Sequence, residues 1–563
     1  ISDMENKKAE KSQAELYREE RKKRMAAAAK KNAKKSPQMQ KAKHVAGKVI
    51  GIVIAVALVL GALYAVLNFF GVPQKVLTAA KVGDQRVSIA KYNLYYMDIY
   101  MGISQQSQQY DSTYGEGYGA MYTGYDSTKT PMEQAYTLGT IEGFEGENPT
   151  WADYMRINAL NYLQSYVAYA DLAREAGLTL TEDEQKEIDD QIEQLRSTAE
   201  SNDFSLNRYL VQMYGKGVNE KLLREVMEER QLASDYAQQK QEELTNAITD
   251  EQINTEYNDN LADYALVSVS AFTVTADTSS VADDATDEEK EAAKTEAMAK
   301  AKTLADGYAA KVTSPETLLE QAKINNSSAT QDSVTYSDVT PSTLTSSFGQ
   351  AACDWVVSAD RAVGDVTVVE SSNGYTVLYL SALPHKDTVK PVDVRHILIA
   401  FPTDDDGNVE DLTDDQKLEY YEKAKSVYDQ YLANPTEDNF ATLASTNSED
   451  PGSKDNGGLY EEVNVGDMVD AFNDWCFDAS RKPGDTGIIE TEYGYHIMYY
   501  VGNDHDETWK TTVKTALSNE AFNSFDTETL KGDTYKLTES SMMINWAASQ
   551  LESLITKQYI SYN

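Results

Sequence analysis

Apolar residues follow two different spacings along this chain, and the spacing separates a helical region from a mixed one. Over residues 151–260 they recur at helical intervals, as in NALNYLQSYVAYADLAREAGL, which we expect to end at Gly177. Thr181 with Glu184, and Thr249 with Gln252, have the capping-box spacing that opens a helix. This region is therefore predicted to be helical.

Short strands alternate with helices further along the chain. Residues 264–274, YALVSVSAFTV, predict a strand that an acidic, alanine-rich helix follows. The same order returns later, with VDVRHILIAF (392–401) as a strand, DDQKLEYYEKAKSVYDQYLA (414–433) as a helix and GYHIMYYV (494–501) as the closing strand. The pattern favours an α+β fold class with two similar units of about 120 residues.

A repeat with a constant offset underlies the two units. Trp355 and Trp475, Gly364 and Gly484, Gly374 and Gly494, and Tyr375 and Tyr495 are all separated by the same interval. A repeat of this length indicates a duplicated domain, not a solenoid unit. The copies differ where chemistry is expected, because Thr376 stands in the place of His496 and Ala352 in the place of Phe472.

One apolar run predicts a membrane anchor. Residues 49–70 carry no charge, and about 20 apolar residues span a bilayer as a helix. Lys41, Lys43 and Lys48 precede the run, so the positive-inside rule keeps that end in the cytoplasm. We favour an uncleaved signal anchor over a cleaved signal peptide, whose apolar core is typically only ~7–15 residues. The expected localisation is a bacterial cell membrane, single-pass, with most of the chain extracytoplasmic.

Charge is distributed unevenly between the two sides of this run. The net charge of the chain is −40, yet residues 1–48 hold 15 Lys/Arg against 6 Asp/Glu. We interpret this basic tail as an orientation signal attracted to anionic lipid, in preference to nucleic-acid binding. The only two cysteines, Cys353 and Cys476, lie in different repeats at non-equivalent positions, which favours free buried thiols over a disulfide.

These patterns divide the chain into six parts. The C-terminal part has apolar residues such as Trp546, Leu551 and Ile555 that need cover, and the N-terminal helical domain is the natural partner. The Gly/Tyr-rich insertion is expected to be a flexible loop, with a surface that holds unfolded chains as the alternative. The parts are a basic tail (1–48), the anchor (49–70), a helical domain (76–260) with its insertion (103–150), a first α+β unit (264–383), a second α+β unit (393–503) and a helical segment (506–563).

Four separated features of the second unit converge on one site. They are His396 in a strand interior, Asp450 ahead of the Gly457-Gly458 turn, Met468 and Phe472 four apart on one helix face, and Thr491 with His496 in the closing strand. Together, RHILI, the Gly-Gly-Leu turn, the Met-x-x-x-Phe pair and GYHI resemble the parvulin family of peptidyl-prolyl cis–trans isomerases. The resemblance covers residues 393–503.

The parvulin resemblance implies a role for each of these residues. His396 and His496 are the paired histidines, Thr491 joins their hydrogen-bond network, and Asp450 lies beside the substrate peptide bond. The remaining implied residues bind the proline ring: Leu459, Met468 and Phe472. Tyr493 departs from the residue found in some members of the family, and we expect it to narrow the substrate cleft. No cofactor and no metal is expected, because isomerisation only lowers a rotational barrier of about 18–20 kcal/mol.

Other interpretations of these residues stay open. The two histidines are equally well explained as buried scaffolding or as directly catalytic groups. A metal site formed by His396, His496 and Asp450 is an alternative, and Met468 with Phe472 can also be plain core. The first unit has no histidine between His44 and His385, so it resembles a parvulin fold without activity and suits a peptide-binding or spacer role.

The N-terminal helical domain resembles the chaperone region of the SurA/PrsA group of extracytoplasmic foldases. AKVGDQRVSIAKY and ALNYLQSYVAYADLAREAGLTLTEDEQKEI carry this resemblance, while the tyrosine-rich insertion and the duplicated unit are departures from the group. The implied partners are unfolded exported proteins that contain Xaa-Pro bonds. Two alternatives are a membrane-anchored holdase without catalysis and an envelope-assembly protein that uses inactive parvulin folds.

Overall fold

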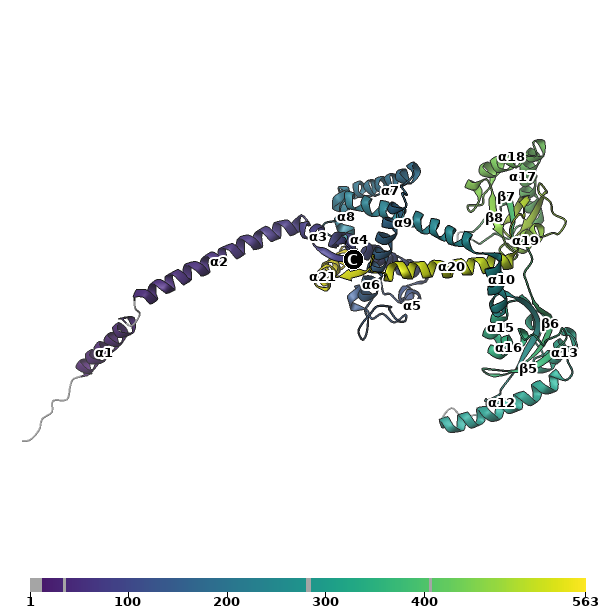
Figure 1. Ribbon diagram of the computed structural model, residues 1–563, viewed down its shortest axis with the longest axis horizontal. Coiled ribbons are helices and arrows are strands. Elements are labelled where there is room, and N and C mark those ends of the chain that lie inside the picture. Colours follow the sequence, from purple (N-terminus) through teal and green to yellow (C-terminus); the bar gives the residue numbers. More distant parts are fainter. Residues whose placement is uncertain (1–12, 34–36, 280–284, 405–407, 563) are drawn as a thin grey trace, which may run out of the picture. The chain divides into compact units, whose positions relative to one another are not determined.

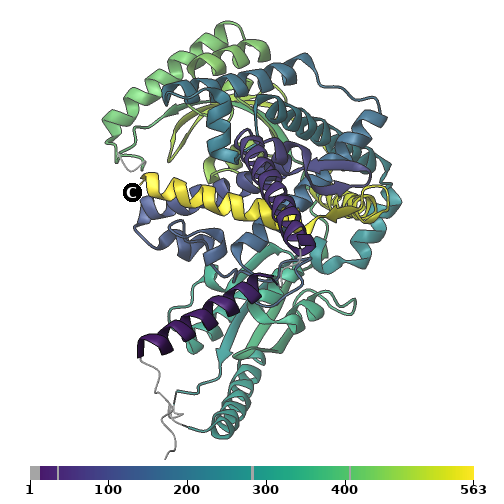
Figure 2. The same ribbon diagram turned by 90° about the vertical axis from the view of Figure 1, so that its left-hand side faces the viewer.

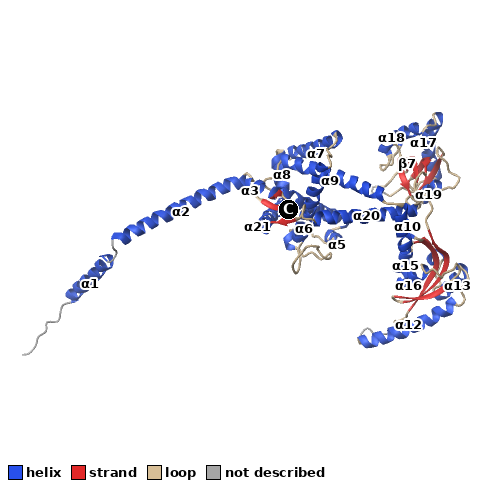
Figure 3. Cartoon of the chain, in the orientation of Figure 1, coloured by secondary structure: helices blue, strands red, loops and turns tan. Residues whose placement is uncertain are grey.

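The two main bodies of the chain are best described one at a time. A computed structural model describes residues 13–33, 37–279, 285–404 and 408–562 (Figure 1). Contacts within the chain define unit 1, formed by Ile1–Gln239 and Phe525–Asn563, and unit 2, formed by Lys240–Ser524. Figure 3 shows that most of the strands belong to unit 2 and that unit 1 is mainly helical.

The two ends of unit 1 meet in a small sheet. The strand order is β11 (Leu537–Glu539), β1 (Thr78–Val82) and β2 (Gln85–Ser88), all antiparallel, with Ala80 opposite Glu539. Helix α21 (Ser541–Tyr562) follows β11 and packs against α4 (Ile89–Tyr114), which buries Leu551 and Ile555. Figure 2 shows α21 in yellow beside the blue elements of the N-terminal part. The C-terminal segment is therefore part of the same body as the N-terminal helices.

Local capping signals set the helices predicted for residues 151–260. The capping boxes expected at Thr181 and at Thr249 are confirmed, since each side chain accepts from the backbone N–H three residues later. Gly177, at φ +80°, follows the end of α6 and confirms the predicted stop. The helices are α6 (Trp151–Glu175), α7 (Glu182–Ser201), α8 (Leu206–Tyr214), α9 (Glu220–Ala247) and α10 (Asp250–Asp259).

The Gly/Tyr-rich stretch 103–150 is less loop-like than its composition predicts. Helix α4 begins after Ser88, whose side chain accepts from the Lys91 N–H, and it runs on to Tyr114. Gly115, at φ +113°, ends it. A short helix, α5 (Tyr118–Thr123), and a 3-10 turn, η1 (Pro131–Glu133), follow. Buried tyrosines on α4, among them Tyr92 and Tyr95, anchor the first half of this helix and extend it into the stretch.

The predicted transmembrane segment needs correction. Residues 49–69 lie in α2 (Pro37–Phe69), between α1 (Gln13–Ala33) and α3 (Val72–Val76). Within the described residues, no helix combines the length and the apolar character needed to cross a membrane. The fold prediction was wrong in including a membrane-spanning helix.

Unit 2 contains two antiparallel four-stranded sheets with corresponding strand orders, β4-β3-β6-β5 and β8-β7-β10-β9. The strands of the first sheet are β3 (Leu266–Thr275), β4 (Thr335–Val339), β5 (Val366–Ser371) and β6 (Gly374–His385). Those of the second are β7 (Val392–Ala400), β8 (Leu459–Val463), β9 (Thr486–Thr491) and β10 (Gly494–Gly502). The strands expected at 264–274, 392–401 and 494–501 are thereby confirmed, and the whole chain is a mixed α+β structure.

Helices complete each half of unit 2. Around the first sheet they are α12 (Asp287–Ala309), α13 (Pro315–Asn325), α14 (Gln331–Val334), α15 (Pro341–Phe348) and α16 (Gln350–Val356). Around the second they are α17 (Asp414–Ala433), α18 (Glu437–Asn447), the 3-10 turn η2 (Lys454–Asn456) and α19 (Asp470–Cys476). Trp509, on α20 (Thr508–Lys531), packs with Tyr257 of α10 near α11 (Leu261–Tyr264).

The second sheet has two different faces because side chains alternate along each strand. Ile397, Ile399 and Ile497 point toward α17 and α18, and they form a core with residues such as Phe440. Val394 and Met498 point to the opposite side and pack with Phe472 of α19. His396 shares this second face, because it lies two residues after Val394 on the same strand.

Candidate active site

Two neighbouring central strands place the histidines together. On β7 and β10, His396 is opposite Met498 and His496 is opposite Leu398, so the two imidazoles are diagonal neighbours on one face. Their Nδ1 atoms lie 3.0 Å apart, and the rings are nearly parallel with centroids 5.2 Å apart. Both are buried, with exposed fractions of 3% and 5%. The edge of Phe472 contacts both rings.

A hydrogen-bond chain extends from each histidine. Oγ1 of Thr491 lies 2.8 Å from Nε2 of His496, and Nε2 of His396 lies 3.0 Å from Oδ2 of Asp450. Thr491, the last residue of β9, lies opposite Gly494 of β10. Gly494 is two residues before His496, so the Thr491 side chain is within reach of the His496 ring. The structure thus brings together the four residues expected to form the polar part of the site.

Asp450 is the charged residue at one end of this hydrogen-bond chain. His396, Ser453 and Tyr460 all contact the same oxygen, Oδ2, with Tyr460 Oη at 3.0 Å. The hydrogen bond from His396 holds the pKa of the Asp450 carboxyl well below its usual range, although desolvation opposes this shift. Asp450 is therefore a carboxylate at neutral pH, and it can only accept hydrogen bonds.

His496 is neutral at physiological pH. Burial, assisted by the charge of His396, lowers its pKa from 6.5 to about 3. When both rings are neutral, the carboxylate of Asp450 requires a proton on Nε2 of His396, so Nδ1 of His396 accepts. His496 then donates from Nδ1 and accepts at Nε2 from Thr491. A single set of proton positions satisfies every contact from Thr491 to Asp450.

A close backbone approach sets the position of the strand beside the histidines. The N–H of His396 donates to the carbonyl of Gly458 over 2.8 Å. Gly458 has φ +75°, and a Cβ at this position would lie 2.3 Å from the carbonyl oxygen of His396. Only glycine fits there, which explains the Gly457-Gly458 turn noted in the sequence.

An apolar cleft of ≈ 430 Å³ opens above the histidines. Met468 is half-buried and Tyr493 is half-exposed at its rim. Leu459, by contrast, does not line this cleft. It is opposite Arg395 and therefore belongs to the other face of the sheet, whereas its neighbour Tyr460 is opposite Val394 and faces the histidines. The apolar and aromatic lining includes Leu398, Phe401, Tyr460, Met468, Phe472 and Tyr493.

Sequence reasoning missed several residues of the site. Leu398 and Tyr460 could be predicted from the alternation of side chains along a strand. Leu398 lies two residues after His396 on β7, and Tyr460 of β8 lies opposite Val394, so both share the face of the histidines. Ser453, which is 1% exposed and contacts both His396 and Asp450, has no such signal because it lies in a loop before η2. Phe401 follows the last residue of β7 and also lacks a strand pattern.

The first sheet of unit 2 lacks this site. Ala271 is opposite Leu378, which places it where the second sheet has His396. Thr376, at the position of His496, is fully buried and lies 2.9 Å from the hydroxyl of Thr273. Ala352 is buried at the position of Phe472. A threonine pair and small side chains therefore fill the space that holds imidazoles in the other copy.

The orientation of the two histidines argues against the alternative of a metal centre. Nδ1 of each histidine is directed at the other ring, and both Nε2 atoms contact side-chain oxygens. Across the described part of the chain, no group of three or more His, Cys, Asp or Glu side chains has an arrangement that could hold a metal ion. All four ring nitrogens are therefore engaged in one hydrogen-bonded network.

The fold and the paired histidines define a parvulin-type isomerase domain. Residues 378–502 match the family model of the PPIC-type PPIASE domain, so the chain contains a parvulin domain of this type. Foldase protein PrsA 1 of Listeria innocua serovar 6a is 29% identical over 128 residues, which are 22% of this chain and 36% of that protein. Foldase protein PrsA of Caldanaerobacter subterraneus subsp. tengcongensis is 32% identical over 143 residues, 25% of this chain and 39% of that protein. The chain thus spans less than half the length of these curated relatives.

Two solved structures are also similar to parts of this chain. The peptidylprolyl isomerase PrsA from Bacillus anthracis matches with 20% identity and a TM-score of 0.16, over 30% of this chain and 61% of that one. The foldase protein PrsA from Streptococcus pneumoniae matches with 12% identity and a TM-score of 0.22, over 76% of this chain and 99% of that one.

Proposed function

We propose that this protein is an extracytoplasmic foldase whose second α+β unit, residues 393–503, catalyses the cis–trans isomerisation of Xaa-Pro bonds. The observation that carries the proposal is the unbroken hydrogen-bond chain from Thr491 to Asp450 beneath an apolar cleft. The match to the PPIC-type PPIASE domain and the likeness to PrsA foldases support it. Unfolded exported proteins are the proposed partners.

The apolar cleft supplies binding and part of the catalysis. A proline ring fits against Met468 and Phe472, and Tyr493 narrows the entrance. Twisting the amide breaks its resonance, so the twisted form has less charge separation than either planar form. An apolar surface disfavours the more polar planar states and so favours the transition state over both. Each tenfold gain in rate requires only about 1.4 kcal/mol of such preference.

The polar chain acts as a positioning device in this proposal. Thr491, His496 and His396 hold the Asp450 carboxylate at the edge of the cleft, where it faces the electron-poor side of the rotating amide. Tyr460 bonds to the same oxygen and lines the same cleft. No proton is transferred and no covalent bond is formed, so the histidines serve by orientation and not as acids or bases.

The first α+β unit, residues 264–383, is proposed to be non-catalytic. It has Ala271 and Thr376 where the second unit has histidines, and Ala352 where the second has Phe472. Such a unit can contact peptide chains or act as a spacer, but it offers no comparable polar chain.

A proline-limited refolding assay tests the proposal. The full chain is compared with a Met468→Ala, Tyr493→Ala double variant, which removes cleft side chains that are not deeply buried. Leu418→Ala serves as the control, because Leu418 is 53% exposed on α17 and outside the cleft. We expect the double variant to lose at least tenfold in catalysed rate and the control to retain it. If all three match the uncatalysed rate, the isomerase function is excluded.

A holdase is the second candidate function, favoured by the loss of the site in one of the two copies. Aggregation of an unfolded test protein is measured alongside isomerisation. Suppression by a chain that shows no isomerase activity supports the holdase. Suppression that disappears with the cleft variants supports a single peptide-binding cleft for both effects.

A further inference from the structure

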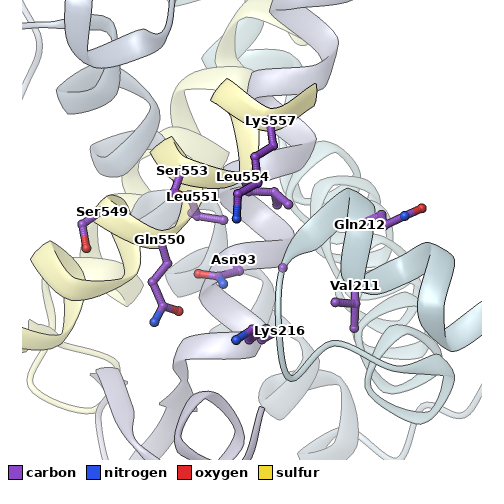
Figure 4. Close-up of a pocket in the computed structure, with 11 residues that line it drawn as sticks. Asn93, Val211, Gln212, Lys216, Ser549, Gln550, Leu551, Ser553, Leu554 and Lys557 are labelled. Atoms are coloured by element: carbon purple, nitrogen blue, oxygen red, sulfur yellow. The ribbon is translucent and has the colours of Figure 1, made fainter. Parts of the chain in front are cut away.

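A second cavity lies within unit 1. It has a volume of ≈ 360 Å³ and is lined by residues of α4, of α8 with the turn that follows it, and of α21. Pockets that bind small ligands usually have about 300–1,000 Å³. Figure 4 shows that its lining residues come from three segments far apart in the sequence.

The floor of this cavity holds an amide oxygen without a partner. Asn93 is 1% exposed, and its Oδ1 forms no hydrogen bond with any described residue. Leaving a buried amide oxygen unpaired is costly, so Asn93 points to a bound group that the cavity receives.

The space beside this amide is kept open by a glycine. Gly215 follows α8 with φ +92°, and a Cβ there would lie 3.2 Å from Nδ2 of Asn93. The same Cβ would approach Leu551 and Leu554 at 3.7 and 3.9 Å. Together with Val211, these two leucines provide an apolar wall next to the amide. The cavity therefore combines one unpaired acceptor oxygen with an apolar surface.

Two lysines give the cavity a positive rim. Lys216 and Lys557 both line it and are exposed, and neither forms an ion pair with a described residue. Figure 4 shows Asn93 between them, with Lys557 on one side and Lys216 on the other. The C-terminal end of α8 contributes only about half a negative charge, which two lysines outweigh. Free cations around one cavity are unusual in a chain of net charge −40.

We propose that this cavity binds the free C-terminus of a peptide chain that ends in an apolar residue. The carboxylate lies between Lys216 and Lys557, the last peptide N–H donates to Oδ1 of Asn93, and the last side chain packs on Leu551 and Leu554. Ser553 lines the same cavity, and its hydroxyl can donate to the carboxylate. This inference goes beyond the isomerase function, since it uses neither proline nor any residue of the cleft in unit 2.

Fluorescence anisotropy with the full chain tests the proposal. The probe is a labelled hexapeptide without proline that ends in leucine, used with a free carboxylate and, separately, as the C-terminal amide. We expect the acid to bind about tenfold more tightly than the amide, as two exposed charge pairs imply. A Lys216→Ala, Lys557→Ala double variant is expected to lose this preference. Lys81→Ala with Lys531→Ala, two exposed lysines of unit 1 that do not line the cavity, is the charge-matched control and is expected to keep it.

Three results would overturn the proposal. They are equal affinity for the acid and the amide, an unchanged preference in the Lys216→Ala, Lys557→Ala variant, and displacement of the peptide by decanoate below the peptide's own dissociation constant. The last result would identify a fatty acid as the occupant. Proline-limited refolding is followed in the same preparations and is expected to be unaffected, so failure of this proposal and failure of the isomerase function are distinguishable.

Discussion

His396 and His496 face each other through their Nδ1 atoms, 3.0 Å apart, in a site from which water is almost fully excluded. Two neutral imidazoles share one proton well in this geometry, whereas two imidazolium ions would both present N–H groups to the same gap. The geometry therefore disfavours protonation of both rings at the same time. This relationship makes the stability of the second α+β unit sensitive to acid.

The first prediction follows from the pKa of His496, which burial lowers from 6.5 to about 3. Between these values the unfolded chain binds a proton that the folded unit does not, so stability is full above pH 6.5 and falls as the pH drops toward 3. We expect a loss on the order of 2–3 kcal/mol between pH 7 and pH 4. The pKa of Asp450 is also lowered, so this residue adds a loss of stability only below the pKa that its carboxyl has in the unfolded chain.

Urea unfolding at several pH values, followed by the fluorescence of Trp475, measures this effect. A His496→Thr variant, which carries the residue of the first unit, is expected to be less stable at pH 7 and to have a flatter pH profile from 7 to 4. An equally steep profile in the variant would show that the acid sensitivity comes from other groups.

The second prediction concerns Asp450→Asn. An amide has one acceptor oxygen where the carboxylate accepts from His396, Ser453 and Tyr460, and its NH₂ group meets donors. The hydrogen-bond chain must rearrange, and we expect kcat/KM for a proline peptide to fall by about tenfold or more. Asp467→Asn is the matched control, because Asp467 lines the same cleft but, among the described residues, bonds only to Asn464. Equal losses in the two variants would mean that only the charge of the cleft matters.

Much of the second unit could be predicted from its residues. The strand around His396, the helix at 414–433 and the closing strand follow from local patterns of apolar residues, and the paired histidines follow from the motifs. Leu459, which the parvulin resemblance implies for the cleft, lies one position out of phase with the face of β8 that lines it; Tyr460, opposite Val394, is in phase. A strand's alternation decides such questions only once its partner register is known.

The rest depends on contacts between distant segments. Ser453 reaches His396 across a gap of 57 residues in the sequence, and β11 pairs with β1 from opposite ends of the chain. Neither contact leaves a periodic trace. The stretch that contains the end of α4 differs from its prediction for another reason. Its composition, rich in Gly, Tyr and Ser, predicts a loop, whereas burial of Tyr92 and Tyr95 stabilises a helix.

The third prediction concerns Cys476, which is 1% exposed on α19 next to Trp475. Burial raises the pKa of its thiol to about 12, despite the nearby charge of Arg481. Because the thiolate is the reactive form, iodoacetamide at pH 8 should scarcely label Cys476 in a Cys353→Ser chain. Labelling should accelerate in urea when α19, which also carries Phe472, detaches. Fast labelling in native buffer would show that α19 opens without global unfolding.

The fourth prediction compares two glycines with similar backbone angles. Gly458 (φ +75°) and Gly466 (φ +90°) both lie in the left-handed region, where alanine costs roughly 1–2 kcal/mol. At Gly466 no atom lies within 4 Å of an added Cβ, so Gly466→Ala should cost only this conformational amount. At Gly458 the added Cβ also meets the His396 carbonyl at 2.3 Å and Ala444 at 2.9 Å, which adds roughly 1–3 kcal/mol of overpacking.

Gly458→Ala should therefore separate β8 from β7, remove Tyr460 from Asp450 and reduce isomerase activity, while Gly466→Ala leaves activity nearly intact. Urea unfolding and kcat/KM of both variants check this, and equal destabilisation would show that the contact between β7 and the Gly458 turn is not tight.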